Sequence, residues 1–260
     1  MRSGNWGRPR DCEVGCPRSA SVGLMTARPI AVEHHFTLGL LILTASTGAI
    51  DAVSYLALDR VFTGNMTGNV LFLGFGLVGI GGIPLLNNSV ALIGFILGSM
   101  VSGRIVGRGH PKGALPVSSR WVLGVSAALI ALLAAFWLTV GTLAHPELLI
   151  LTGLLAVVMG SQVSAVKPIG NSDVTTIVVT NTVANLARDS RLAGGKGEQW
   201  LARLGAVVAM GAGAAMGAAA VHLSGGALAL LVAAIIFVLG TLTLVWAARR
   251  HHRHHGAAEA

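Results

Sequence analysis

Four polar residues recur at helical spacing within one apolar stretch of the chain: Thr44, Thr47, Asp51 and Ser54. Separations of three, four and three residues place them on one face of a helix. A carboxylate inside an apolar helix is costly, and it usually faces a partner or a water-filled cavity. The spacing therefore predicts either a polar stripe that lines a pathway, with Asp51 as its ion or proton site, or a structural carboxylate bonded to a neighbouring helix.

Two asparagine pairs add further polar groups, each pair with its members one helical turn apart. Asn65 and Asn69 share one helical face, and Asn181 and Asn185 share another. An asparagine amide offers both donors and an acceptor, so it can hold a polar solute. It is also a common N-cap of a helix. We expect these four residues either to cap short helices only or to cap them and also contact a solute.

Lys167 is the last candidate of this kind, and it stands directly before Pro168, which is expected to end an apolar segment. A lysine beside a helix end usually extends its amine to the membrane interface. Lys167 could therefore be a functional residue opposite Asp51 or a lysine at the membrane interface, and both alternatives stay open.

The chain contains no zinc-protease, serine-hydrolase or phosphate-loop motif. We therefore expect neither an enzyme nor a cofactor or metal site, the histidine-rich C-terminus being more typical of a basic, solvated end.

The composition indicates the environment in which these residues must lie. Hydrophobic residues make up 53% of the 260 residues and charged residues 11%, whereas soluble proteins carry about 25% charged residues. A soluble enzyme, a disordered chain and a disulfide scaffold are all excluded, and an integral membrane protein is indicated. The net charge of +8 comes from residues in short loops and at the two ends. That placement is typical of topology signals and not of nucleic-acid binding.

Hydropathy and charge together predict an all-α protein with six transmembrane helices, because a crossing helix needs about 20 apolar residues. Two further segments, 62–83 and the Thr-rich 175–187, are ambiguous. Loops rich in Arg and Lys should face the cytoplasm, and six crossings place every basic cluster and both termini there. The two ambiguous segments are therefore predicted to be broken or re-entrant. The six expected spans are 36–58, 86–106, 121–143, 148–166, 200–222 and 227–247.

The organisation predicted from these segments is one membrane domain over residues 31–248. Residues 1–30 are expected to form a disordered basic tail, with Met25 as an alternative start, and residues 249–260 a basic tail. A shift of 116 positions lays the second asparagine pair over the first and Lys167 over Asp51. The halves, about 36–143 and 148–247, each hold three spans, so the second would be inverted. Inverted repeats with interrupted helices are typical of transporters.

Two motifs carry a resemblance to a known family. The stretch TGAIDAVSYL at residues 47–56, followed by VFTGNMTGN at 61–69, resembles the signature of the YoaK family. MGSQ at 159–162, followed by TT at 175–176 and VTNT at 179–182, is similar to a second region of that family. These are bacterial multi-span inner-membrane proteins whose biochemical function is not established. The resemblance thus implies a class and a location, but no substrate.

The predicted function is a cytoplasmic-membrane transporter or channel for a small polar or anionic solute. Its site would lie between the halves, with Asp51 as the charged residue, Thr44 and Thr47 along the path and the four asparagines orienting the solute. The alternative is a non-transporting scaffold or sensor subunit in which these residues are sealed in a dry interface. Small-residue patterns such as Gly94, Gly98 and Gly213, Gly217 predict close helix packing and allow a homo-oligomer.

Overall fold

The computed structural model describes residues 30–79, 82–110, 113–170, 179–195 and 199–256. Every regular element in these ranges is a helix, and the side chains of 30–35 and 251–256 are not described. Short 3-10 turns follow α5 and α6. The α-helices are α1 (Ile30–Ala57), α2 (Met66–Leu77), α3 (Leu85–Val106), α4 (Val117–Val140), α5 (His145–Val166), α6 (Val179–Arg188) and α7 (Trp200–Gly256).

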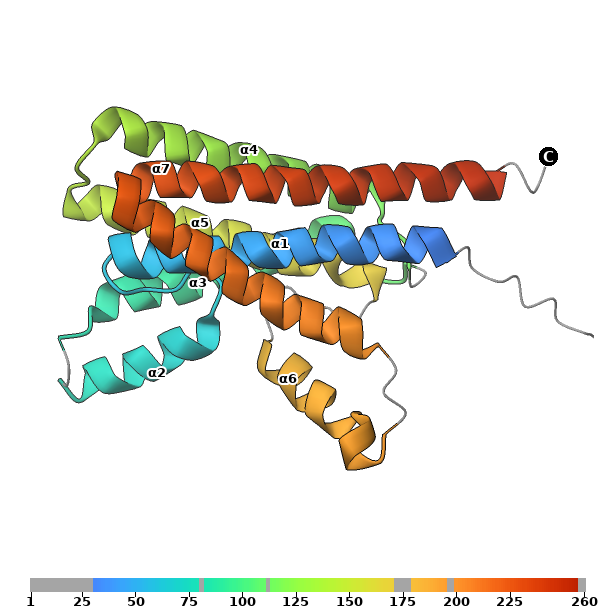
Figure 1. Cartoon of the computed structure of the whole chain (residues 1–260). Helices are drawn as coiled ribbons and strands as arrows, with labels where there is room; N and C mark the ends of the chain where they lie inside the picture. The colour runs from blue at the N-terminus through green and yellow to red at the C-terminus, as the bar shows by residue number, and fades with distance from the viewer. Residues whose placement is uncertain (1–29, 80–81, 111–112, 171–178, 196–198, 257–260) are drawn as a thin grey trace, which may run out of the picture.

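Five helices of the described chain are long and apolar enough to cross a membrane: α1 over Phe36–Ala57, α3, α4, α5, and α7 over Trp200–Arg250. The last of these is 57 residues long and is interrupted at Gly225, whose φ of 82° and ψ of 171° are not helical. Glycine reaches that conformation without steric cost. The interruption divides α7 into two arms that run in opposite directions (Figure 1). The expected spans 200–222 and 227–247 lie one on each arm.

The two ambiguous segments are short helices. α2 has 12 residues and α6 has 10, which correspond to lengths of about 18 and 15 Å against a hydrocarbon core of about 30 Å. After α2 the chain turns at Val78 and Gly79 and returns along α3 (Figure 1). Segment 62–83 is therefore not a continuous rod. Of segment 175–187, residues 179–187 lie in α6 and the rest lies outside the described residues.

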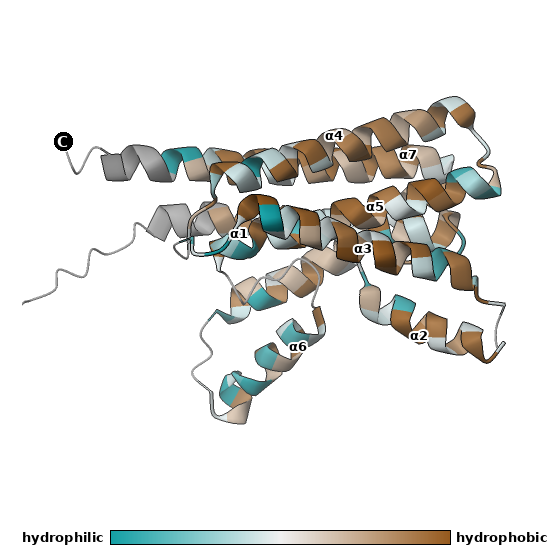
Figure 2. Ribbon diagram, turned by 180° about the vertical axis from the view of Figure 1, so that it is seen from behind, coloured by the Kyte–Doolittle hydropathy of each residue, from teal (hydrophilic) through white to brown (hydrophobic). Residues whose placement is uncertain are grey.

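α1 packs chiefly on α7 and is the most buried candidate span, with 67% of its apolar window inside the protein. Leu43, Ile50 and Val53 are fully buried. The other candidate spans expose apolar side chains, for example Ile93 and Met100 on α3, and Figure 2 shows hydrophobic residues along α3, α4 and α5. Such faces suit contact with lipid, as expected for an all-α membrane protein.

Glycines hold two helix pairs in close contact. On α7, a Cβ added to Gly213 would overlap the carbonyl oxygen of Ala45 on α1. On α3, a Cβ added to Gly98 would overlap the carbonyl oxygen of Val157 on α5. Both glycines belong to the small-residue patterns in the sequence, so the predicted close packing is confirmed within the chain. The pairs α1–α7 and α3–α5 are therefore in backbone contact at these positions.

Serine hydroxyls reinforce the α3–α5 pair. Ser99 donates to the carbonyl oxygen of Gly160 at 3.1 Å, and Ser164 donates to that of Ser99 at 3.0 Å. Ser161 donates to Gly98 at 3.2 Å. Ser164, which lies one helical turn before Lys167, therefore takes part in a structural contact between α3 and α5.

The described ends of the chain differ from the predicted tails. α1 begins at Ile30, and α7 continues as a helix through Gly256. The start of the predicted C-terminal tail is therefore an extension of α7, while 1–29 and 257–260 lie outside the described residues. Both ends of the described chain lie at the same end of the bundle (Figure 1).

Candidate functional site

Asp51 is a carboxylate buried inside the span of α1, with 5% of its surface exposed. Its Oδ1 accepts hydrogen bonds from the backbone N–H of Gly64 at 2.7 Å and of Thr63 at 3.1 Å. The Thr63 hydroxyl lies 3.5 Å from the same oxygen. The other oxygen, Oδ2, is buried and has no hydrogen-bond partner within the described part of the chain. Oδ1 of the carboxylate therefore accepts hydrogen bonds, whereas Oδ2 accepts none from the described residues.

The amides reach Asp51 because the chain reverses after α1. Asp59 and Arg60 both adopt left-handed backbone conformations, with φ of 66° and 57°. The chain then passes back beside α1. At Gly64 a Cβ would lie 3.1 Å from Cγ2 of Thr47 and 3.2 Å from Oδ2 of Asp51. A glycine at this position therefore lets the loop approach the carboxylate closely.

The first asparagine pair shapes this loop. Asn65 caps α2 by accepting from the N–H of Gly68 at 3.3 Å, and its side chain is exposed. Asn69 is fully buried and holds the backbone of Phe62 from both sides. It donates to the Phe62 carbonyl at 2.6 Å and accepts from the Phe62 N–H at 3.0 Å. Both asparagines are thus engaged in holding the loop that contacts Asp51.

We expect Asn69→Ala to destabilise the protein more than Asn65→Ala. The first change leaves the Phe62 N–H and C=O without their partner, and a buried unpaired polar group costs about 1–3 kcal/mol. The second removes an exposed cap, which is worth about 0.5–2 kcal/mol. Thermal unfolding of the purified variants in detergent measures the difference. Equal shifts of the two midpoints would contradict the role given to Asn69.

Gln162 on α5 reaches α1 at Thr47, one helical turn before Asp51. Its Nε2 donates to the hydroxyl of Thr47 at 3.2 Å, and that hydroxyl donates to the carbonyl of Leu43 at 3.0 Å. Because the hydroxyl hydrogen is already used, Thr47 can only accept from Gln162, and the amide must present its nitrogen. Its Oε1 does not take part in that bond; it is buried and has no hydrogen-bond partner among the described residues.

Gln162 is not among the functional residues predicted from the sequence, although its residue type and position in the span were a signal. It is the largest polar side chain in the expected span 148–166, and an intramembrane polar group is a functional hypothesis by default. Thr44, which was selected, is fully buried and donates to the carbonyl of Leu40 at 2.8 Å within its own helix.

Lys167 does not pair with Asp51. It is exposed and begins the 3-10 turn Lys167–Ile169 at the end of α5. α1 and α5 run in opposite directions (Figure 1), and both residues stand near the C-terminal end of their helix. They therefore lie toward opposite ends of the bundle, and Lys167 is exposed at a helix end, away from Asp51.

The second asparagine pair lies in a different environment from the first. Asn181 is exposed and Asn185 is half-buried. The guanidinium of Arg203 on α7 donates to the Asn185 carbonyl at 3.0 Å and to Asp189 at 2.7 Å. Hydrogen bonds from Arg188 and Arg203 hold the pKa of Asp189 below its usual value. These contacts tie α6 to α7.

The eight residues selected from the sequence are therefore not brought together. Figures 1 and 2 both show α2 and α6 apart, with α2 near the end at which α1 terminates. Thr47 and Asp51 share one site, and Gly64 and Gln162 join them there. We refer to Thr47, Asp51, Gly64 and Gln162 as the Asp51 cluster.

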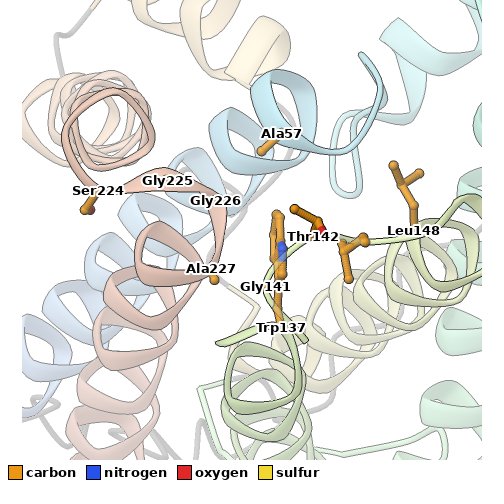
Figure 3. Close-up of a pocket in the computed structure, with 10 residues that line it drawn as sticks. Ala57, Trp137, Gly141, Thr142, Leu148, Ser224, Gly225, Gly226 and Ala227 are labelled. Atoms are coloured by element: carbon orange, nitrogen blue, oxygen red, sulfur yellow. The ribbon is translucent and has the colours of Figure 1, made fainter. Parts of the chain in front are cut away.

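A pocket of about 420 Å³ lies near that end of the bundle (Figure 3). Gly141 and the break at Gly225 contribute backbone without side chains to its wall, and the ring of Trp137 also lines it. Ala57 also lines it and is six residues beyond Asp51, about 9 Å along a helix. Neither this pocket nor the apolar groove between α3 and α5 is lined by Asp51 or by the four asparagines.

The comparisons with known proteins place the whole cluster inside a matched region. Residues 39–243 match the family described as Protein of unknown function (DUF1275). The chain belongs to this family. Among curated proteins, the UPF0700 transmembrane protein YoaK of Bacillus subtilis (strain 168) is 36% identical to this chain over 164 residues, which cover 61% of this chain and 68% of that protein. The resemblance to the YoaK family is thus confirmed. No solved structure matches the chain.

This DUF1275 chain is a membrane protein, on the evidence of its apolar helices and its transmembrane relative. Among the described residues, no three His, Cys, Asp or Glu side chains gather as metal ligands. Within the Asp51 cluster, Asp51 is the ionisable residue, and Thr47 and Gln162 supply neutral polar groups.

Proposed function

We propose that this protein is an inner-membrane transporter for a small polar or anionic solute, built from two inverted halves that meet at the Asp51 cluster. One observation carries the proposal. A carboxylate is buried inside a span, one of its oxygens is held by an interrupted segment and the other has no partner among the described residues. Such a group is expensive in a membrane, and packing alone does not require it.

The arrangement of the helices supports two related halves. α1 packs on the first arm of α7 through Gly213, as α5 packs on α3 through Gly98. The helices α1 and α5 are antiparallel (Figure 1), and Gln162 bonds to Thr47 between them. In this interpretation α1, α3, α4, α5 and the two arms of α7 are six crossings. The short helices α2 and α6 are the interrupted segments, one from each half.

The distribution of charge supports an orientation for this topology. Arg104 near the end of α3, Arg120 near the start of α4 and Arg203 near the start of α7 fall at the end of the bundle where α1 begins. Basic residues concentrate on the cytoplasmic side of bacterial membrane proteins. Both ends of the chain would then be cytoplasmic, and the pocket at Gly225 would open to the outside.

We infer a path between this pocket and the Asp51 cluster, which the pocket does not reach in this conformation. The pocket of about 420 Å³ is of the size that small-molecule sites usually have. Ala57 connects its wall to the helix that carries Asp51. Thr47 and Gln162 are fully buried, so this conformation represents a closed state. Movement of one helix pair against the other would open the cluster to one side of the membrane at a time.

The test is transport by the purified protein in liposomes adsorbed on a solid-supported membrane. Amino acids, small carboxylates, inorganic anions and polyols are applied as concentration jumps, and a pH-sensitive dye inside the vesicles records electroneutral exchange. We expect at least one class to give a response that protein-free liposomes lack. Silence for every class with correctly inserted protein would count against a transporter.

A scaffold or sensor subunit is the second candidate, and a specific observation favours it: the Asp51 cluster is buried and neither described pocket reaches it. The two functions differ in water access. In a chain whose Cys12 and Cys16 are replaced by serine, a cysteine at Thr44 should react with a water-soluble thiol reagent in membranes if a path opens. It should stay unreactive in a sealed scaffold.

A further inference from the structure

We propose that the Asp51 cluster is a binding site for a monovalent cation of the Na⁺ class. The site itself is argued from its oxygen atoms. Only the idea that the bound ion drives solute movement rests on the proposed transport function. Its ligands would be Oδ2 of Asp51, Oε1 of Gln162 and the hydroxyl oxygen of Thr47.

Three oxygens of the right type belong to one small region. Asp51 Oδ2 and Gln162 Oε1 are both buried and have no hydrogen-bond partner among the described residues. Thr47 precedes Asp51 by one helical turn and is bonded to Gln162 at 3.2 Å. The Cα of Gly64 lies against both Thr47 and Asp51, because a Cβ there would touch both side chains. The groups from α1 and the loop thus meet at Gly64, and the α5 group joins them through its bond to Thr47.

The orientations of these groups suit a cation better than a further hydrogen bond. The backbone amides of Thr63 and Gly64 hold Oδ1 of Asp51, so the carboxylate cannot turn freely. The hydroxyl of Thr47 fixes the amide nitrogen of Gln162 and leaves its oxygen free. Carboxylate, amide and hydroxyl oxygens are the hard donors that alkali and alkaline-earth ions prefer.

The charge of the cluster indicates a monovalent ion. Asp51 is its sole charged group: Lys167 is exposed at the end of α5, and Asp59 is exposed and bonded to Asn87 at 2.8 Å. A single carboxylate balances a single positive charge. A divalent ion in the same place would leave one net charge buried in the membrane, at a high cost in free energy.

Binding at this place would also link the ion to movement. The three ligands come from α1 and α5, and the interrupted segment holds the same carboxylate from its other side. A cation would favour the conformation in which these elements are together. A change in conformation that separates α1 from α5 would release it.

The test measures thermal unfolding of the full-length protein in detergent, with NaCl replacing choline chloride at constant ionic strength and constant pH. We expect the unfolding midpoint to rise with Na⁺ and to saturate, with a smaller response to K⁺. Gln162→Leu should weaken the apparent affinity for Na⁺ at least about tenfold, because the loss of one ligand is comparable to the loss of one charge-assisted contact. Asp51→Asn should abolish the response.

The matched control is Thr241→Val, which removes a buried hydroxyl on α7 that has no hydrogen-bond partner among the described residues. It should keep the full Na⁺ response. Binding of radioactive sodium to the wild type and to Gln162→Leu keeps the test decisive if Asp51→Asn does not fold. Equal midpoints in Na⁺ and choline, or a response retained by both cluster variants, would overturn the site.

The failures of the two proposals are distinguishable. A midpoint that depends on pH but not on Na⁺ would overturn the cation site, and transport of a solute could still be observed. Conversely, the wild type could respond to Na⁺, the cluster variants could lose that response, and no solute could be transported. That result would support the cation site and overturn the transport function.

Discussion

Asp51→Asn should strongly reduce solute-driven currents while the protein still inserts into liposomes. Asparagine has the same shape as aspartate, and its Oδ1 can still accept from the amides of Thr63 and Gly64. The charge that would couple an ion or a solute to movement is lost. We expect a reduction of about a hundredfold, the upper range of coupling between sites. Currents normalised to the amount of inserted protein measure the effect.

The control for this substitution is Asp59→Asn, which removes one negative charge from the loop that follows α1. Asp59 is exposed, and an amide oxygen can replace the carboxylate oxygen that accepts from Asn87. We expect its currents to stay close to those of the wild type. Undiminished currents in Asp51→Asn would remove this residue from the transport mechanism.

Gly213→Ala should lower the stability of the protein far more than Gly211→Ala on the same helix. The added methyl group at Gly213 would overlap the carbonyl oxygen of Ala45, and α1 and α7 would have to move apart. Overpacking of a tight contact costs about 1–3 kcal/mol and sometimes more. At Gly211 no atom lies within 4 Å of the added carbon, so the change should be within about 0.5 kcal/mol.

The midpoint of thermal unfolding in detergent compares these two variants, and the same experiment on α3 provides a replicate. There Gly98 contacts the carbonyl oxygen of Val157, whereas Gly103 has open space. If the two members of either pair behave alike, the close backbone contact is not what stabilises these helices.

The apolar helices could be predicted from the sequence because hydropathy is a local property. Each expected span needs only its own residues to be recognised, and even the break in α7 was indicated, since the spans 200–222 and 227–247 leave Gly225 between them. The short helix α2 was indicated in the same way, by glycine and threonine in segment 62–83.

The contacts of the Asp51 cluster could not be predicted, because they join distant parts of the chain. Gln162 and Thr47 are 115 residues apart, and only the fold shows which of their atoms are left without partners. Of the two placements left open for Lys167, the one opposite Asp51 is not found, for another reason. Positions that correspond along the chain fall at opposite ends when the two helices run in opposite directions.

The glycine contacts in α1–α7 and α3–α5 leave little freedom within each pair, since backbone touches backbone there. Each pair can be regarded as a rigid body, and tightly packed contacts shift between discrete arrangements instead of deforming gradually. The free-energy difference between conformations is then concentrated in the few side chains between α1 and α5. Conservative substitutions in that thin layer would redistribute the populations of the conformers and leave the stability of each rigid body unchanged.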